Sequence, residues 1–263
     1  MTRTRKSLLT LLALAALTEP ARVILAALLP DAAADPVPGM LAGMALSLVM
    51  LGLPAWLLRP WTGTRLTRRG PLWSGVLLGA ATAVLIRAAM GPLDLRWQEL
   101  TGVMPRTLPA PDGFSLGALC VVALAVVPAL TEEAFFRGAL LTGLLEGSSR
   151  VTTVHLTTVC FVLMHGNLAS LPSLMVLAIL LALLMIRTGH IAVPVAAHLV
   201  YNLTALKWTA LPGWVGILSG AVLAGMVVYL ANCHLTDGHR RMKLPDTLMA
   251  AAAIAVMVLY YFV

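Results

Sequence analysis

Two adjacent carboxylates and an arginine stand inside a long apolar run of this sequence. Glu132, Glu133 and Arg137 occur in the string TEEAFFRG, and Arg137 follows Glu133 by one helical turn. Ionisable groups in apolar segments are costly, which makes each of them a candidate for function. Arg137 can pair with Glu133 on one helix face, either as a purely structural ion pair or as the support of a site. Because one guanidinium cannot neutralise two carboxylates, Glu132 is the stronger candidate for chemistry.

Two further pairs of residues repeat the one-turn spacing. Phe161 and His165 occur in CFVLMHG, and His198 and Asn202 occur in AHLVYN. Residues four apart share one face of a helix. An isolated histidine in a membrane helix more often forms a helix–helix hydrogen bond than a catalytic contact. Two histidines together with an asparagine and a carboxylate pair instead favour a functional site.

The depths of these groups can be compared by counting residues from the turns of the chain. Glu132 precedes the turn at 147–150 by fifteen residues and His165 follows it by fifteen, so both lie roughly 22 Å from it. His198 follows the turn at 188–189 by nine residues, or roughly 14 Å, and the asparagine comes one helical turn later. If both turns lie on one side of a membrane, the four groups fall near one level. We therefore expect them to line one cavity.

This set of side chains supports hydrolysis without a covalent intermediate. A carboxylate beside a histidine can hold a water and deprotonate it as a general base. A second histidine and an asparagine amide can donate hydrogen bonds to a developing oxyanion. Together these groups suit the hydrolysis of a peptide bond.

Zinc catalysis is the alternative that the sequence leaves open. Glu133, His165 and His198 could supply two imidazoles and one carboxylate to zinc, with water in the fourth position. The HExxH pattern is absent, however, and the ligands would come from three separate segments. Each zinc-bound histidine also needs a partner for its other ring nitrogen, and few polar residues remain for that task. We therefore expect no cofactor.

The three patterns, in this order, resemble the motifs of a known family. EExxxR, FxxxH and HxxxN are similar to the motifs of the CPBP family, also called Abi or the CAAX protease and bacteriocin-processing family. This family includes the type II CAAX prenyl endopeptidase. The resemblance covers about 114–208, which would be the core of a single membrane domain spanning 1–263.

The resemblance implies an intramembrane endopeptidase and assigns a role to each motif residue. Glu132 and His165 would activate water, while His198 and Asn202 would stabilise the oxyanion. The preferred account of this family is a glutamate mechanism rather than a metal one. The residues implied to support the site are Glu133, Arg137 and Phe161.

The composition of the chain points to a membrane. Of its 263 residues, 60% are hydrophobic and 11% are charged, and the mean hydropathy is +0.92. A soluble domain is usually about 25% charged. The net charge of +7 would suggest nucleic acid in a soluble protein, but flanking Lys and Arg residues explain it better here. We expect membrane lipid and a membrane-associated protein or peptide substrate as partners, and no nucleic acid.

Apolar segments near the length of about 20 residues that a spanning helix needs recur along the chain. We predict an all-α polytopic bundle of eight or nine spans. The candidate segments are Ser7–Leu29, Val37–Leu58, Trp73–Met90, Phe114–Leu145, Val151–His165, Leu168–Ile186, Ile191–Trp208, Pro212–Ala231 and Leu248–Val263. The proline-containing stretch Gly91–Gly113 is expected to be an irregular external loop.

Basic residues before the first span and after the second and eighth predict an N-terminus in the cytoplasm, with a bacterial cytoplasmic membrane as the expected location.

Other polar residues receive structural interpretations. Glu19 and Arg22 would form a pair within one helix, Arg87 would extend toward the external interface, and Tyr201 would join an interfacial belt.

Two other classes of protein remain alternatives to a peptidase. One is a non-enzymatic membrane immunity or scaffold protein that keeps the motifs, and the other is a small transporter whose polar groups line a path. An intact set of four candidate residues argues against the first, and the lack of an internal repeat argues against the second.

Overall fold

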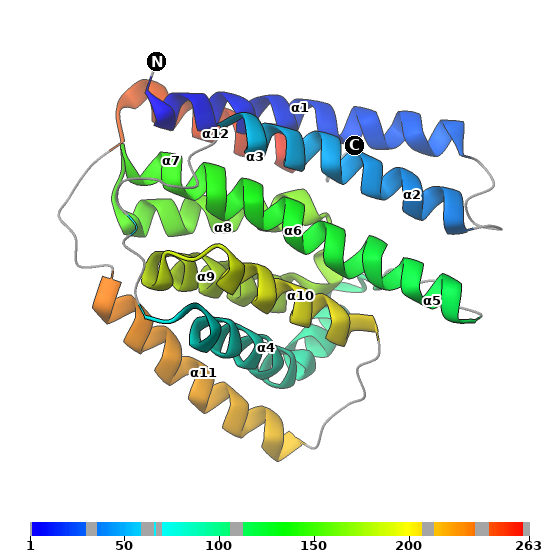
Figure 1. Ribbon diagram of the computed structural model, residues 1–263, viewed down its shortest axis with the longest axis vertical. Coiled ribbons are helices and arrows are strands. Elements are labelled where there is room, and N and C mark those ends of the chain that lie inside the picture. The colour runs from blue at the N-terminus through cyan, green and yellow to red at the C-terminus, as the bar shows by residue number, and fades with distance from the viewer. Residues whose placement is uncertain are drawn as a thin grey trace.

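The protein is a bundle of helices, most of which lie side by side (Figure 1). This computed structural model describes residues 2–29, 36–58, 66, 70–105, 113–206, 213–234 and 242–259. Every regular element within these ranges is helical. In lipid the backbone must satisfy its own hydrogen bonds, and a helix does so within one segment. The predicted all-α class is confirmed.

The helices follow the predicted apolar segments. Their bounds are α1 (Arg3–Leu28), α2 (Pro36–Ser47), η2 (Leu48–Gly52), α3 (Leu53–Leu58), α4 (Leu72–Thr101), α5 (Phe114–Val121), η3 (Val122–Val126), α6 (Val127–Glu133), η4 (Ala134–Leu141), α7 (Thr142–Leu145), α8 (Arg150–His165), η5 (Leu168–Ser170), α9 (Leu171–Thr188), α10 (Ala192–Leu206), α11 (Gly213–His234) and α12 (Leu244–Leu259). The elements η2, η3 and η4 are π-helical stretches inside longer helices, and η5 is a 3₁₀ turn. Such π stretches are frequent at functional sites.

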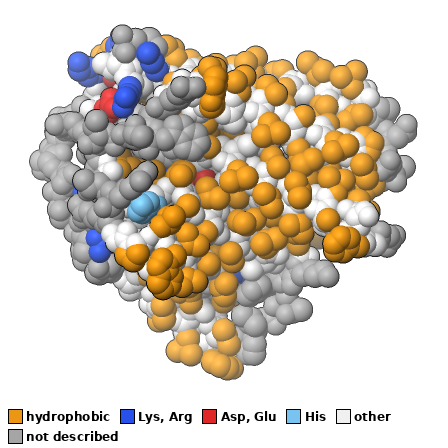
Figure 2. All heavy atoms as spheres, in the orientation of Figure 1, with side chains coloured by type: hydrophobic (Ala, Val, Ile, Leu, Met, Phe, Trp, Pro, Cys, Tyr) orange, Lys and Arg blue, Asp and Glu red, His pale blue; other side chains and the backbone are white. Residues whose placement is uncertain are grey.

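Five of these segments are long and apolar enough to cross a membrane, counted among the described residues. They are Arg3–Leu28, Pro36–Leu58, Leu72–Thr101, Phe114–Leu145 and Leu168–Thr188. Apolar side chains cover most of the face in Figure 2, while Lys and Arg gather near the N-terminal end. The chain is an integral membrane protein. The predicted number of eight or nine spans stays a prediction, since the apolar stretches Ala192–Leu206, Trp214–Val228 and Leu244–Leu259 have only 10–17 residues within the described part of the chain.

The third span is longer than predicted. The sequence placed an irregular loop from Gly91 onward, whereas α4 continues through Pro92 and ends at Thr101, before Gly102. Side chains of this extension donate to backbone carbonyls of η5: Trp97 to Leu168 at 2.8 Å and Gln98 to Ala169 at 3.0 Å. Tertiary packing thus keeps helical a stretch that its prolines and polar residues marked as a loop.

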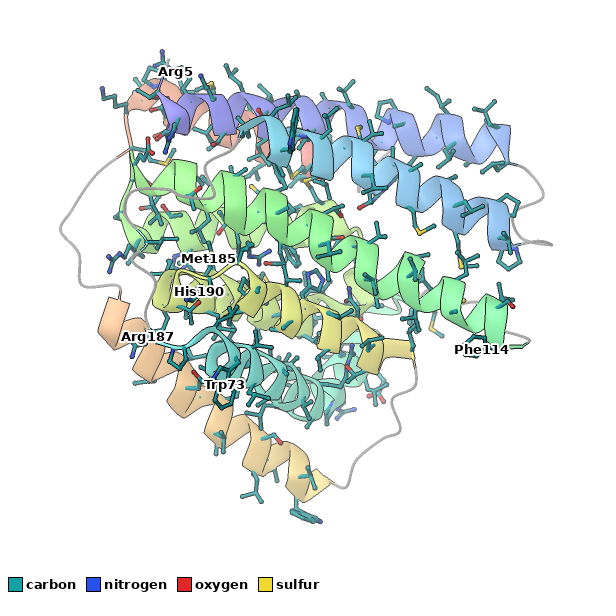
Figure 3. All side chains as sticks on the ribbon, in the orientation of Figure 1. Arg5, Trp73, Phe114, Met185, Arg187 and His190 are labelled. Carbon is teal, nitrogen blue, oxygen red and sulfur yellow. The ribbon has the colours of Figure 1, made fainter. Side chains whose placement is uncertain are left out.

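The helix α9 is the centre of the bundle. Two thirds of its apolar window (67%) is buried inside the protein, against 11% for the segment formed by α2 to α3. It ends at Gly189, whose φ of +66° is a left-handed conformation that glycine adopts without strain. Arg5 and Arg187 lie toward one end of the bundle and Phe114 toward the other (Figure 3).

The N-terminal helix docks closely on the end of the fourth apolar segment. Thr4 Oγ1 donates to the carbonyl of Gly143 at 2.8 Å, and Ser7 Oγ donates to that of Ala139 at 3.4 Å. A side chain at Gly143 would collide with Ser7, so glycine permits this approach. The same contact fixes the position of α1 beside α6 to α8.

Candidate active site

Three of the four predicted catalytic side chains converge where α6, α8 and α10 meet. Glu132 Oε2 lies 3.3 Å from His165 Nε2 and 3.9 Å from His198 Nε2. The three candidate ligand atoms all lie within 4.8 Å of one another. These groups lie at one depth because they stand at similar distances along their helices from the turns at 147–150 and 188–189, and both turns lie at the same end of the bundle.

Hydrogen bonds fix which ring nitrogen of each histidine faces Glu132. His165 Nδ1 donates to the carbonyl oxygen of Phe161 at 3.1 Å. His198 Nδ1 donates to Glu133 Oε1 at 2.9 Å. A carbonyl or carboxylate oxygen only accepts, so in a neutral imidazole Nε2 carries the lone pair. Two nitrogen lone pairs and a carboxylate oxygen therefore face each other, an arrangement that calls for a shared proton, a water or a cation.

A fully buried ion pair stands behind this cluster. Arg137 donates to Glu133 Oε1 at 3.0 Å and to the carbonyl of Ala178 at 3.1 Å, and both charged side chains are 0% exposed. The guanidinium carbon lies 4.3 Å from the centroid of the Phe161 ring. Phe161 in turn packs against the His165 ring, with 4.3 Å between the centroids. Arg137 thus holds Glu133, which holds His198, and Phe161 orients His165.

The fourth predicted residue forms no hydrogen bond with the other three and does not line the cavity beside them. Asn202 is half-buried one turn after His198, and its side chain forms no hydrogen bond within the part of the chain that the structure describes. The expectation that all four groups line one cavity is not met. Glu132 and His165 line the cavity, whereas His198 is fully buried behind them.

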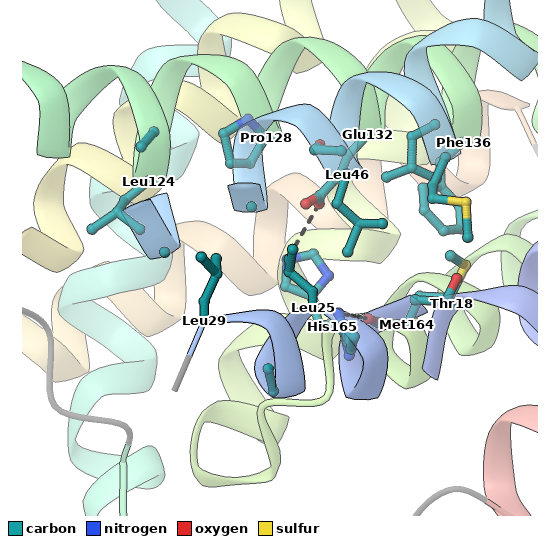
Figure 4. A pocket seen from close by; sticks show the side chains of 18 residues that line it. Thr18, Leu25, Leu29, Leu46, Leu124, Pro128, Glu132, Phe136, Met164 and His165 are labelled. Atoms are coloured by element: carbon teal, nitrogen blue, oxygen red, sulfur yellow. Dashed lines mark hydrogen bonds and ion pairs between the residues drawn. The ribbon is translucent and has the colours of Figure 1, made fainter. Parts of the chain in front are cut away.

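The cavity beside Glu132 and His165 has a volume of about 800 Å³. Glu132 and His165 face one another in Figure 4, with leucines of α1, η3 and α2 around them. Among the described residues that line the cavity, Glu132 is the only carboxylate and Arg22 the only Lys or Arg. The remaining lining residues are mostly apolar or small: Thr18, Leu25, Ala26, Leu29, Gly39, Gly43, Leu46, Ser47, Met50, Leu51, Ala123, Leu124, Pro128, Phe136 and Met164.

Comparison with known families identifies the segment that carries these side chains. Residues 114–204 match the family described as Type II CAAX prenyl endopeptidase Rce1-like. This segment is similar to that family. No curated protein and no solved structure matches the chain. The resemblance that the motifs suggested is confirmed for these residues.

Most of the cavity wall, eleven of its eighteen lining residues, comes from outside the segment that matches this family. The helices α1 and α2, with η2, supply Arg22, Gly39, Gly43 and Ser47 among others. The sequence analysis gave these two spans no role in the site. A signal was available in the paired glycines, since Gly39 and Gly43 are one helical turn apart and open space along one face of α2.

Arg22 is a residue whose place in the site sequence reasoning missed. The predicted pair with Glu19 is present at 2.5 Å. Arg22 also donates to the carbonyl of Met164 at 3.3 Å, in the last turn of α8 and directly before His165. Helix ends leave such carbonyls without partners inside the helix. Arg22 therefore connects α1 to the end of α8 that carries His165. The residue that follows this end, Gly166, has a φ of +62°.

The carboxylate nearest both histidines differs from the one named for zinc in the sequence analysis. Glu133 Oε1 is engaged by Arg137 and His198 Nδ1, whereas Glu132 Oε2 faces both Nε2 atoms. Glu132 Oε2 and His198 Nε2 are buried and have no hydrogen-bond partner among the described residues. Two imidazoles and one carboxylate fit a zinc site in kind and in spacing. The sequence left few polar residues to bind the other ring nitrogen of each histidine. In the structure the Phe161 carbonyl binds His165 Nδ1, and the Glu133 carboxylate binds His198 Nδ1.

The string GFSLG around Ser115 matches the GxSxG pattern of nucleophilic hydrolases. That pattern acts where a strand turns into a helix. Ser115 instead lies exposed in the first turn of α5. It stands seventeen residues before Glu132 in one helical segment, or roughly 25 Å away. Ser115 is therefore not part of the cluster.

Proposed function

We propose that the protein is an intramembrane endopeptidase that hydrolyses a peptide bond in a membrane-associated protein or peptide. The observation that carries the proposal is the convergence of Glu132 Oε2 with the Nε2 atoms of His165 and His198 beside an apolar cavity. The endopeptidase name of the family matched by 114–204 supports the same reaction. An apolar cavity between helices favours a substrate that reaches the site from the membrane.

In the proposed mechanism Glu132 is the general base, assisted by His165. Glu132 takes a proton from water as the water oxygen forms a bond to the carbonyl carbon. Collapse of the tetrahedral intermediate breaks the C–N bond, and Glu132 returns the proton to the departing amine. The direct 3.3 Å approach of His165 to Glu132 suits a shared proton that holds the carboxylate in place.

His198 and Asn202 are proposed to stabilise the oxyanion. The hydrogen bond from His198 Nδ1 to Glu133 orients the ring, and in the mechanism Nε2 donates to the oxyanion while it carries a proton. The Asn202 amide has no other hydrogen bond among the described residues and can donate as well. Donors aimed at developing charge in a site that excludes water contribute most to catalysis.

Zinc hydrolysis is a second candidate, favoured by the set of Glu132, His165 and His198. A zinc ion held by these residues would act as a Lewis acid toward water and the substrate carbonyl. Glu132 would then be a ligand and could not also be the free base. Because Glu133 is committed to Arg137 and His198, the described cavity offers no second carboxylate for that task. This favours Glu132 as the base.

The proposal extends to the setting of the enzyme. We place it in a bacterial cytoplasmic membrane with the N-terminus in the cytoplasm, as the distribution of Lys and Arg predicts. The proposed single domain comprises the Rce1-like segment and the flanking helices, since α1 and α2 complete the cavity. A transporter would need a path that opens to both sides, and an immunity or scaffold protein would need no activity.

The test uses purified protein in proteoliposomes with peptides that carry an apolar membrane anchor and a fluorophore–quencher pair. Glu132→Gln keeps the shape of the side chain and removes the base, so kcat should fall by about 10² or more. Glu99→Gln, at an exposed carboxylate that forms a salt bridge with Arg96, is the matched control and should equal wild type. Equal cleavage by Glu132→Gln and wild type would exclude the peptidase assignment.

A further inference from the structure

A second polar network, which the proposed mechanism does not use, is buried between α4, α9 and α10. At its centre the Asp94 carboxylate accepts a hydrogen bond from the backbone N–H of Ser173 at 3.0 Å. Asp94 is 5% exposed and Ser173 is 1% exposed. Ser173 lies in the first turn of α9, where backbone N–H groups have no partner inside the helix. A carboxylate from α4 thus caps the start of α9.

The same serine receives a hydrogen bond from α10. Tyr201 Oη donates to Ser173 Oγ at 2.6 Å, and Ser173 Oγ donates to the carbonyl of Ser170 at 3.1 Å. Arg87 of α4 covers the Tyr201 ring at 4.1 Å and donates to the Tyr201 carbonyl at 3.3 Å. The sequence analysis had placed Arg87 and Tyr201 at the membrane interface, and both are instead engaged inside the protein.

This network joins the two segments that carry the catalytic histidines. The 168–173 stretch begins three residues after His165, and α4 binds it through Trp97, Gln98 and Asp94. Tyr201 lies between His198 and Asn202 on α10. In Figure 1 α4 lies beside α10, away from α1 and α2, so the network supports the site from the side opposite the cavity wall.

We propose that Asp94 and Tyr201 are positioning residues of the active site. The proposal rests on the proposed peptidase function. By anchoring Tyr201 to Ser173, the network fixes the rotation of α10 about its axis, and that rotation sets where His198 and Asn202 point. By capping α9, Asp94 fixes the stretch that follows His165. A turn of α10 by about 20° would displace side-chain ends by roughly 1–2 Å, given a helix radius near 2.3 Å at Cα.

A displacement of this size is enough to affect catalysis without unfolding the protein. Misplacing reacting groups by about 1 Å can cost on the order of 10²-fold in rate. Replacement of one hydroxyl leaves the packing of the tyrosine ring and the Arg87 contact in place. The rate is therefore expected to respond more strongly than the stability.

The sharpest variant is Tyr201→Phe, which removes only the hydroxyl bound to Ser173. Its matched control is Thr82→Val, which removes a buried hydroxyl of α4 that donates to the Leu78 carbonyl and lies 3.6 Å from Met226 Sδ, away from the network. Tyr201→Phe should lower kcat by about 10-fold or more with KM changed less than about 3-fold. Its Tm should fall no further than that of Thr82→Val, which should keep the wild-type kcat.

Variants at the other end of the network distinguish support of the site from general stability. Asp94→Asn keeps an acceptor oxygen for the Ser173 N–H and should retain most of kcat, whereas Asp94→Leu should lose it. If Tyr201→Phe does not fold, Ser173→Ala removes the same hydrogen bond and keeps the backbone N–H for Asp94. A wild-type kcat in Tyr201→Phe, or in Ser173→Ala where Tyr201→Phe does not fold, would overturn the proposal. A kcat loss equal to that of Thr82→Val would overturn it as well. If wild type and Glu132→Gln cleave equally, the function itself fails, whatever Tyr201→Phe does.

Discussion

The buried pair of Arg137 and Glu133 offers a test of how the site is held together. Replacing Arg137 by methionine keeps much of the apolar stem and leaves the Glu133 carboxylate buried without its cation. The pair is 3.0 Å apart, which corresponds to about 5 kcal/mol of attraction at an effective dielectric constant near 20. Breaking a buried pair costs about 3–5 kcal/mol, so we expect the free energy of unfolding to fall by that amount.

Two companion variants make the expected loss specific to the charge. Arg137→Lys keeps the charge, but a point-like ammonium cannot reproduce the planar fork that reaches both Glu133 and the Ala178 carbonyl. A loss of about 1–3 kcal/mol is expected for it, because one buried hydrogen bond to a charged group is lost. The double variant Glu133→Gln with Arg137→Met removes both charges and should recover most of the stability lost by Arg137→Met alone.

Thermal unfolding of the purified variants in detergent measures the effect. A loss of 3–5 kcal/mol should lower Tm by on the order of 10 °C in a chain of this size. Exposed Arg96→Met is the control, since its salt-bridge partner Glu99 is also exposed. A Tm loss in Arg137→Met no greater than the control, or a double variant less stable than Arg137→Met, would refute the reasoning.

Two further predictions concern the metal and the cavity. After exhaustive chelation the purified protein should keep its peptidase activity and carry well under one zinc per chain. Metal analysis and the peptide assay measure these two quantities. Stoichiometric zinc, with activity lost to the chelator and restored by metal, would make Glu132, His165 and His198 ligands. Gly43→Trp should raise KM several-fold at unchanged Tm, because Gly43 lines the cavity and a Cβ there meets no atom within 4 Å. Gly225→Trp on α11, also without a neighbour within 4 Å, is its control, and equal KM values for the two variants would contradict a substrate site in the cavity.

The sequence alone determined the class of the fold and the level of the site. Low charge and long apolar segments require a helical membrane protein, because only helices satisfy the backbone within such segments. The segment Phe114–Leu145 was predicted with the bounds that the structure has. Spacing by four residues and equal distances from one turn are properties of the helix itself, so they placed Glu132 and His165 at one depth without tertiary information.

Other features depended on contacts between segments that are distant in sequence. The helix α4 continues past Pro92 because η5 accepts hydrogen bonds from Trp97 and Gln98, which no local pattern reveals. Arg87 and Tyr201 looked like interfacial residues until their partners on neighbouring helices were known. The orientation of the termini stays a prediction, since the loops that carry the deciding charges lie largely outside the described residues.

The choice between the two adjacent carboxylates illustrates the limit most clearly. Successive residues of an α-helix point about 100° apart, so Glu132 and Glu133 point in different directions and approach different nitrogens of the His198 ring. Sequence spacing gives the angle between them but not the rotation of the helix against α8 and α10. That rotation is set by packing, including the contacts of Arg137 with Ala178 and Phe161. Tertiary structure alone therefore decided that Glu132 faces both Nε2 atoms while Glu133 stands behind His198.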